Sequence, residues 1–262
     1  LVIIIEKNRV DNNDRNNVRN NVNVEHFEEH NNSHYSVAWL DCFAKGNSLG
    51  KGIITLGEHS EKGNLNFNIK KNFNISKNFP SFIVNKYTIS FFNKLYYAYH
   101  KNNRKKLVNL FDYFYPLDKI NNWNRLYGKN GFIQYQFVIP NDQVVKNLKF
   151  ILNKINELEI NPFLAVLKKF GKENNNLLSF PMSGYTLALD IKVDKKIFKS
   201  IEELDKIITS LGGRIYLTKD SLMNEKTFKN CYTKWKQFEE IRQKYGAVEK
   251  FRSDQSLRLG LK

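Results

Sequence analysis

The stretch that decides the fold runs from 131 to 221 and opens with GFIQYQFVIP at 131–140. Polar and apolar residues alternate over 132–139, which is typical of a strand whose two faces differ. Gln134 and Gln136 therefore share one face, opposite Ile133, Tyr135 and Phe137. Two neighbouring amides on a sheet indicate a face that binds a polar partner.

A helix is expected after this strand. Apolar residues recur at three- and four-residue spacing over 144–158, behind Asp142, which is a favourable N-cap residue. Pro162 ends the helix, and FLAVLKKF at 163–170 predicts the second strand. The residues that share one face of this strand are Leu164, Val166, Lys168 and Phe170.

The second half of the stretch repeats this pattern. YTLALDI at 185–191 predicts a third strand, and Thr186, Ala188 and Asp190 share one of its faces. A second helix is expected to open with a capping box at 200–203 and to close at the glycine pair 212–213. RIYLT at 214–218 predicts the fourth strand.

The order strand-helix-strand-strand-helix-strand is that of a ferredoxin-like layer. We therefore predict an α+β fold with an antiparallel sheet and both helices on one of its faces. The other face is expected to be a binding surface, because a sheet core does not otherwise accept so many polar side chains. These polar side chains are Gln134, Gln136, Lys168, Thr186 and Asp190.

The remaining residues are expected to flank a core at 131–221. Residues 1–34 are interpreted as a low-complexity segment or the remnant of an upstream domain, and 35–130 as a connecting part. Residues 222–262 are expected to form a C-terminal helix and tail.

Three details of the flanks are predicted. His26, His30 and His34 are spaced to line one face of an exposed helix, but this spacing alone predicts no metal site. The aromatic residues of 82–99 are expected to pack on the main sheet. A helix over 232–245 is expected to bury a ridge of Trp235, Phe238 and Ile241.

The composition indicates a globular protein of 262 residues with a formal net charge of +16. Such a charge suggests nucleic acid or an anionic membrane as a binding partner. Because Lys and Asn are scattered along the chain, nucleic acid is not favoured. A preference for phosphate-bearing or membrane-surface substrates is still expected. Cys42 and Cys231 indicate two thiols in a reducing compartment. We expect a cytoplasmic location or association with the cytoplasmic or periplasmic face of a membrane.

Several motifs in order carry a family resemblance: GFIQYQFVIP, FLAVLKKFG, LSFPMSGYTLALD, GGRIYLTKDS and FRSDQSLRLGL. They resemble the C-terminal half of the flavin-dependent oxidases related to decaprenylphosphoryl-β-D-ribose 2′-oxidase, within the vanillyl-alcohol-oxidase superfamily. The resemblance runs from Tyr35 to the end of the chain. It implies an FAD-dependent oxidoreductase that oxidises a sugar hydroxyl by hydride transfer to flavin. The implied substrate is a polyprenyl-phosphate-linked pentose, oxidised in one half-reaction of a 2′-epimerisation.

The resemblance also implies roles for individual residues. Lys219 is the implied catalytic amine beside flavin and substrate, and Tyr216 is implied to pack at the flavin. Trp39 is implied to wall the sugar pocket, although a core aromatic is its simplest interpretation. The implied substrate-side residues are Gln134, Gln136, Val166, Lys168, Phe170, Thr186 and Ala188. Thr186 and Ala188 replace an asparagine and a cysteine of the mycobacterial enzyme, so identical substrate recognition is not expected.

The glycine-containing loop that holds the FAD pyrophosphate in this family has no counterpart in the sequence. We therefore expect an upstream FAD-binding domain, and weak or no FAD binding by this chain alone. A short-chain reductase is a further implied partner. Two alternatives stay open. The first is an aldonolactone or alditol oxidase, which would resemble D-arabinono-1,4-lactone oxidase and take a neutral soluble substrate. The second is a non-catalytic basic module that binds nucleic acid or membrane.

Overall fold

The computed structural model describes residues 2–10, 24–61, 73–100 and 104–261. Its strands are β1 (Val2–Val10), β2 (Tyr35–Leu40), β3 (Gly52–His59), β4 (Phe73–Asn74), β5 (Arg104–Asn109), β6 (Ile120–Asn121), β7 (Phe132–Pro140), β8 (Pro162–Phe170), β9 (Gly184–Lys192) and β10 (Arg214–Ile215). Its α-helices are α1 (Val24–Glu29), α2 (Lys86–Tyr99), α3 (Leu110–Phe114), α4 (Val144–Glu157), α5 (Ile197–Ser210), α6 (Glu225–Cys231), α7 (Trp235–Lys244) and α8 (Asp254–Arg258). Short 3-10 turns occur at η1 (Gly46–Ser48), η2 (Pro116–Lys119), η3 (Trp123–Tyr127) and η4 (Leu217–Lys219). Of residues 1–34, interpreted from the sequence as a low-complexity segment or the remnant of an upstream domain, 11–23 lie outside the described residues.

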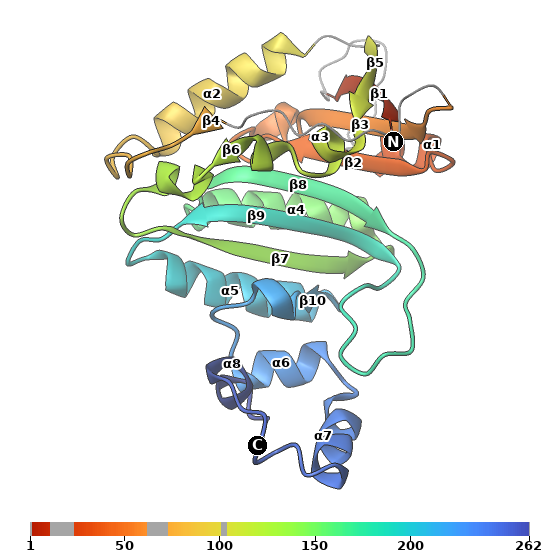
Figure 1. The fold of residues 1–262 in the computed structure, drawn as a ribbon, viewed down its shortest axis with the longest axis vertical. Helices are drawn as coiled ribbons and strands as arrows, with labels where there is room; N and C mark the ends of the chain where they lie inside the picture. Colours follow the sequence, from red (N-terminus) through yellow and green to blue (C-terminus); the bar gives the residue numbers. More distant parts are fainter. Residues whose placement is uncertain (1, 11–23, 62–72, 101–103, 262) are drawn as a thin grey trace.

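One large antiparallel sheet organises the molecule, with the strand order β10-β7-β9-β8-β2-β3-β1-β5. The part β10-β7-β9-β8 has the order of a ferredoxin-like layer, which confirms the predicted α+β fold. β2 extends the layer through the pairs Ala38↔Leu167 and Trp39↔Val166. In Figure 1, α2 lies at one end of the molecule and α6, α7 and α8 lie at the other.

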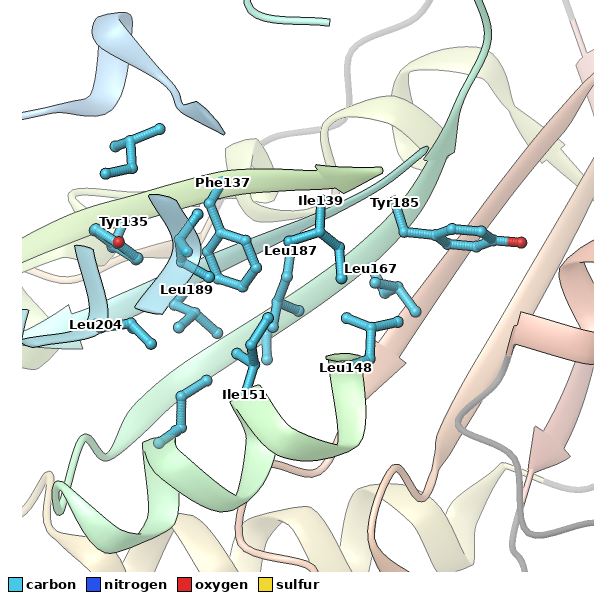
Figure 2. Packing of buried hydrophobic residues seen from close by; sticks show 14 of the residues in the cluster. Tyr135, Phe137, Ile139, Leu148, Ile151, Leu167, Tyr185, Leu187, Leu189 and Leu204 are labelled. Carbon is cyan, nitrogen blue, oxygen red and sulfur yellow. The ribbon is translucent and has the colours of Figure 1, made fainter. Parts of the chain in front are cut away.

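The main core fills the space between this sheet and helices α4 and α5. Phe137 and Ile139 of β7 lie on the side of Leu148 and Ile151 of α4, whereas Tyr135 lies nearer Leu204 of α5 (Figure 2), and all six side chains are buried. Each such burial contributes about 1.5–3 kcal/mol relative to exposure. The helices therefore cover one face of the sheet, as the alternation in β7 predicts.

The predicted starts of both core helices are wrong. Gln143, in the left-handed conformation at φ 49°, precedes α4 in place of Asp142, and no side chain caps the helix. At α5 the Asp194 Oδ1 atom accepts bonds from the backbone N–H groups of Lys196 and Ile197, at 2.8 and 2.9 Å. Ser200 instead donates its hydroxyl to the Leu158 carbonyl at 3.1 Å. Because Asp194 satisfies these first backbone N–H groups, α5 begins at Ile197, three residues before the predicted capping box at 200–203.

The end of α5 agrees with the prediction, whereas the strand after it is shorter than predicted. Gly212 has a φ of +72°, and the Gly213 N–H bonds back to the Ile208 carbonyl at 2.9 Å. β10 stops at Ile215, and the chain turns into η4. The predicted strand at 214–218 is therefore wrong in its second half, so Lys219 lies on a 3-10 turn.

Both predictions for the flanking helices need correction. On α2, Tyr96 contacts Trp39 and Phe92 stacks on Phe163, but other aromatic side chains of this helix face away from the sheet. On α7, Ile241 is 47% exposed and Arg242 is buried in its place. Arg242 is held there by Glu239 at 2.7 Å and by the Phe251 carbonyl at 3.2 Å.

None of the helices in the described ranges is long and apolar enough to cross a bilayer.

A buried carboxyl group on α5 ties this helix to β7. Asp205 is 2% exposed, and its Oδ1 atom accepts a hydrogen bond from the Tyr135 hydroxyl at 2.7 Å. Burial, with smaller contributions from the charges of Asp220 and Glu202, raises the pKa of Asp205 from 3.8 to about 7, although the Tyr135 hydrogen bond and Arg258 oppose the rise. The folded protein therefore binds this proton more tightly than the unfolded chain does.

We predict that Asp205→Asn changes how stability depends on pH. In the parent protein, the contribution of Asp205 to the free energy of unfolding is complete below pH 3.8 and is lost as pH rises through about 7. The parent should lose up to about 1.4 kcal/mol per pH unit relative to Asp205→Asn in this window. Urea unfolding at a series of pH values measures the difference, with exposed Asp142→Asn as the control. Parallel curves for the parent and Asp205→Asn would contradict the assignment.

Candidate functional site

The sheet face opposite α4 and α5, here called the polar face, brings five of the ten predicted site residues into one line. Cross-strand register pairs Gln136 with Ala188, Ala188 with Val166, and Val166 with Trp39. The Tyr216 N–H donates to the Gln136 carbonyl at 2.8 Å and so extends the line past β7. Paired residues of antiparallel strands project to the same side. These five residues, here called the central row, therefore cross the sheet from β10 to β2.

Polar residues lie on both sides of the central row. Register pairs Lys168 with Thr186 on one side and Gln134 with Asp190 on the other. Gln134 Nε2 donates to Asp190 Oδ1 at 2.9 Å, and Gln136 Nε2 donates to Thr186 Oγ1 at 2.9 Å. Fixing each amide nitrogen also fixes the direction of the side-chain carbonyl oxygen. Both glutamines are thus oriented before any ligand arrives.

The charge of Lys219 acts on two residues of this face. Desolvation, and then repulsion from Lys219, lowers the pKa of Lys168. Burial raises the pKa of Asp190, while the Gln134 hydrogen bond and Lys219 oppose that rise. The charge of Lys219, which follows β10, thus acts on side chains of β8 and β9 that lie on the polar face.

An aromatic wall stands at the β10 edge. Tyr216 stacks on Phe180 with ring centroids 4.4 Å apart, and Phe180 meets Phe170 edge-on at 5.7 Å. Phe180 is buried, and it was not among the predicted site residues. The sequence feature that could have indicated Phe180 as a site residue is its position in LSFPMSG, directly before a predicted site strand.

The C-terminal helix holds the segment that carries Lys219. Arg258 Nη2 lies 2.9 Å from Asp220 Oδ2, and Gln255 Nε2 donates to the Leu217 carbonyl at 2.7 Å. The Asp220 side chain is only 4% exposed. Residues on both sides of Lys219 are therefore fixed by α8, which sequence reasoning did not predict.

A depression of about 560 Å³ lies next to the central row. It includes three predicted site residues of β8, which are Val166, Lys168 and Phe170. Tyr35 and Tyr113 line it from other elements. The lining does not include Tyr216, Gln134, Gln136 or Lys219, so the depression extends the β8 side of the polar face and not the edge at β10.

The three histidines singled out in the sequence do not lie together. His34 pairs with Glu58, at the start of β2. His26, Glu29 and His30 do place ligand atoms within 4.8 Å of one another at the surface of α1. His26 already meets Glu29 at 3.3 Å, and His30 Nδ1 bonds to the His26 carbonyl at 3.0 Å, so these groups satisfy one another.

Comparison with known proteins gives matches along most of the chain. Residues 124–258, just over half of the chain, match the family model described as D-arabinono-1,4-lactone oxidase. The chain is 33% identical to the decaprenylphosphoryl-beta-D-ribose oxidase of Mycolicibacterium smegmatis over 236 residues, which are 87% of this chain and 51% of that protein. A further match, 32% identical over 98 residues, covers 37% of this chain and 27% of an uncharacterized protein of Streptomyces coelicolor. The chain thus spans about half the length of its mycobacterial relative.

We predict that Arg258→Met loosens the Lys219 segment. It leaves the buried Asp220 carboxylate without its cation, which should cost about 1–3 kcal/mol in the free energy of unfolding. Hydrogen exchange of the backbone at 217–223 should accelerate. The control is Arg252→Met, which removes an exposed ion pair with Glu249 from the same tail. Equal exchange at 217–223 in both variants would show that Arg258 does not hold this segment.

Proposed function

The chain belongs to the D-arabinono-1,4-lactone oxidase family, and we propose from this that it is the substrate-binding portion of an FAD-dependent oxidoreductase that oxidises a sugar hydroxyl. The observation that carries the proposal is the central row, in which residues from five strands or strand ends share one sheet face. A cation, Lys219, acts on this face from the β10 edge.

The side chains at the β10 edge fit one side of a flavin. Tyr216 offers an aromatic ring already stacked on Phe180, and the ammonium of Lys219 belongs to the same edge. An aromatic ring and a cation complement a flat ring system that accepts negative charge. FAD, when bound, would accept the hydride that leaves the sugar carbon. We propose that a separate FAD-binding domain holds the rest of the cofactor, since the chain spans about half of its relative.

Lys219 is proposed to act on the substrate oxygen. Its ammonium donates hydrogen bonds, so it can position the hydroxyl and stabilise the negative charge that develops on the oxygen as the hydroxyl proton passes to an acceptor such as the Asp190 carboxylate and the hydride leaves the carbon. Asp190 offers a carboxyl group that Gln134 fixes from the neighbouring strand at 2.9 Å. The pair of Lys219 and Asp190 provides one donor and one acceptor at the place where a hydroxyl is to be held.

Gln134, Gln136 and Lys168 are proposed to bind the rest of the sugar. The carbonyl oxygens of the two glutamines suit hydroxyl donors, since their amide nitrogens already serve the sheet. Lys168 is exposed on the polar face, so its ammonium can pair with an anion such as a phosphate. The depression beside Val166 and Phe170, which polar and apolar side chains both line, gives room for a further part of the substrate.

A polyprenyl-phosphate-linked pentose is the proposed substrate. The mycobacterial relative is named for decaprenylphosphoryl-beta-D-ribose, and Lys168 and Lys219 supply two cations for a phosphate. Oxidation would then be one half of a 2′-epimerisation, and a reductase would complete it. Thr186 and Ala188 occupy the centre of the face, where they set the room available to the sugar ring.

A second candidate is the oxidation of a neutral aldonolactone or alditol. The description of the matching family favours it. A neutral soluble substrate would need Gln134 and Gln136 but not the positive charge of Lys168. Turnover of both substrate classes by a Lys168→Met variant separates the two candidates. The variant should bind the phosphate-linked substrate more weakly than the parent does, whereas its affinity for a neutral substrate should be unchanged.

We predict that Lys219→Ala, in the flavin-loaded protein that contains this chain, lowers the rate of flavin reduction by the sugar substrate by about 10²–10³-fold. Stopped-flow bleaching of the flavin absorbance under anaerobic conditions measures this rate. Lys219→Arg should recover part of it because the charge remains. The control is Lys172→Ala, which removes an exposed lysine from the loop after β8. Bleaching that is unchanged by Lys219→Ala would remove this residue from the mechanism and favour a non-catalytic module.

A further inference from the structure

The outer side of α2 is apolar, where a surface helix is normally polar. Tyr87, Phe91, Leu95 and Tyr99 recur there at a spacing of four residues, and are 74%, 63%, 55% and 81% exposed. These four residues are here called the α2 stripe. Phe82, just before the helix, is 75% exposed. A contiguous aromatic surface of this kind marks an interaction site.

Packing on the sheet does not account for the α2 stripe, because other residues of α2 perform it. Ile89 and Asn93 are buried under the helix, and Asn93 Nδ2 donates to Asp41 Oδ1 at 2.8 Å. Tyr96 meets Trp39 at 4.9 Å. The inner side of the helix thus fixes it to the sheet, which leaves the stripe available to a partner outside the described part of the chain.

The segment of the sequence that carries the stripe has basic but no acidic residues. The sequence from 73 to 111 contains no Asp or Glu. Its basic residues are Lys77, Lys86, Lys94, Lys101, Arg104, Lys105 and Lys106. Lys86 and Lys94, on α2 itself, are exposed, and the Lys86 ammonium lies 5.2 Å from the centroid of the Tyr87 ring. The complement of this surface is therefore a partner that is apolar inside and anionic at its boundary.

We propose that α2 docks the protein on an anionic lipid bilayer, with the α2 stripe inserted at the level of the headgroups. An interfacial helix places Phe and Leu below the headgroups and Lys among them, and Tyr suits the boundary itself. Lysines near the surface add attraction to anionic lipids. Nucleic acid would use the same charge, but Leu95, in the middle of the stripe, gives no face for base stacking.

The docking would also bear on the site, because the inner side of α2 touches Trp39 at the end of the central row. A bilayer on the outer side of this helix lies one helix diameter from that end of the polar face, about 10 Å. This inference does not depend on the oxidase activity, since vesicle binding is measured without turnover.

The test is flotation of the protein that contains this chain with vesicles of phosphatidylcholine and phosphatidylglycerol, compared with pure phosphatidylcholine. We expect binding to the anionic vesicles that weakens with salt. Tyr87→Ser/Phe91→Ser should lower the partition coefficient about tenfold or more, because two apolar rings no longer insert. Lys86→Gln/Lys94→Gln should lower it about tenfold on anionic vesicles only.

Matched controls come from the opposite side of the sheet. Phe150→Ser/Phe198→Ser removes two exposed rings, 43% and 47% accessible, from α4 and α5, and Lys195→Gln/Lys199→Gln removes two lysines at α5. Both controls should bind as the parent does, and circular dichroism should show all variants folded. No binding by the parent, or equal losses in the controls, would overturn the proposal. Binding to a single-stranded oligonucleotide through the same residues without vesicle binding would overturn it in favour of nucleic acid.

Discussion

The alternation of side chains in β7, β9 and β8 is the constraint on which the rest of the structure depends. One face of these strands buries Tyr135, Phe137 and Leu187 under α4 and α5. The opposite residues are thereby forced to the other face, where Gln136, Ala188 and Val166 come into register. A shift of one residue in any of these strands would move its polar residues into the core, so core packing also fixes the register of the site.

The C-terminal residues depend on the same arrangement. β10 reaches only to Ile215, and the chain then leaves the strand and forms η4. Asp220 then binds the backbone N–H groups of Leu222 and Met223 at 3.0 and 2.7 Å, and Arg258 returns from the end of the chain to meet it. Lys219 thus owes its position both to the sheet and to α8. The matched family region, residues 124–258, includes Arg258.

The ferredoxin-like order could be predicted from the sequence, because the periods of β7, α4, β8 and β9 are strong and local. The faces of Gln134, Gln136, Lys168 and Thr186 followed from the same alternation. The extension through β2, β3, β1 and β5 could not be predicted, since these pairings join residues distant in the chain. The predicted start of α5 was wrong because Asp194 caps the chain ahead of Ser200, and local pattern does not rank two possible capping residues. Alternation also cannot say which strand ends meet, so Phe180 and the Arg258 contact required the structure.

The central claim is that the polar face, with Tyr216 and Lys219 at its β10 edge, is the substrate side of a flavin site. A crystal structure of the flavin-loaded protein with a bound sugar analogue tests this most directly. The account predicts the flavin ring system against Tyr216, the sugar over Gln136, and Lys219 Nζ within about 3 Å of the reacting hydroxyl oxygen. A flavin bound elsewhere, with Lys219 directed to solvent, would contradict it.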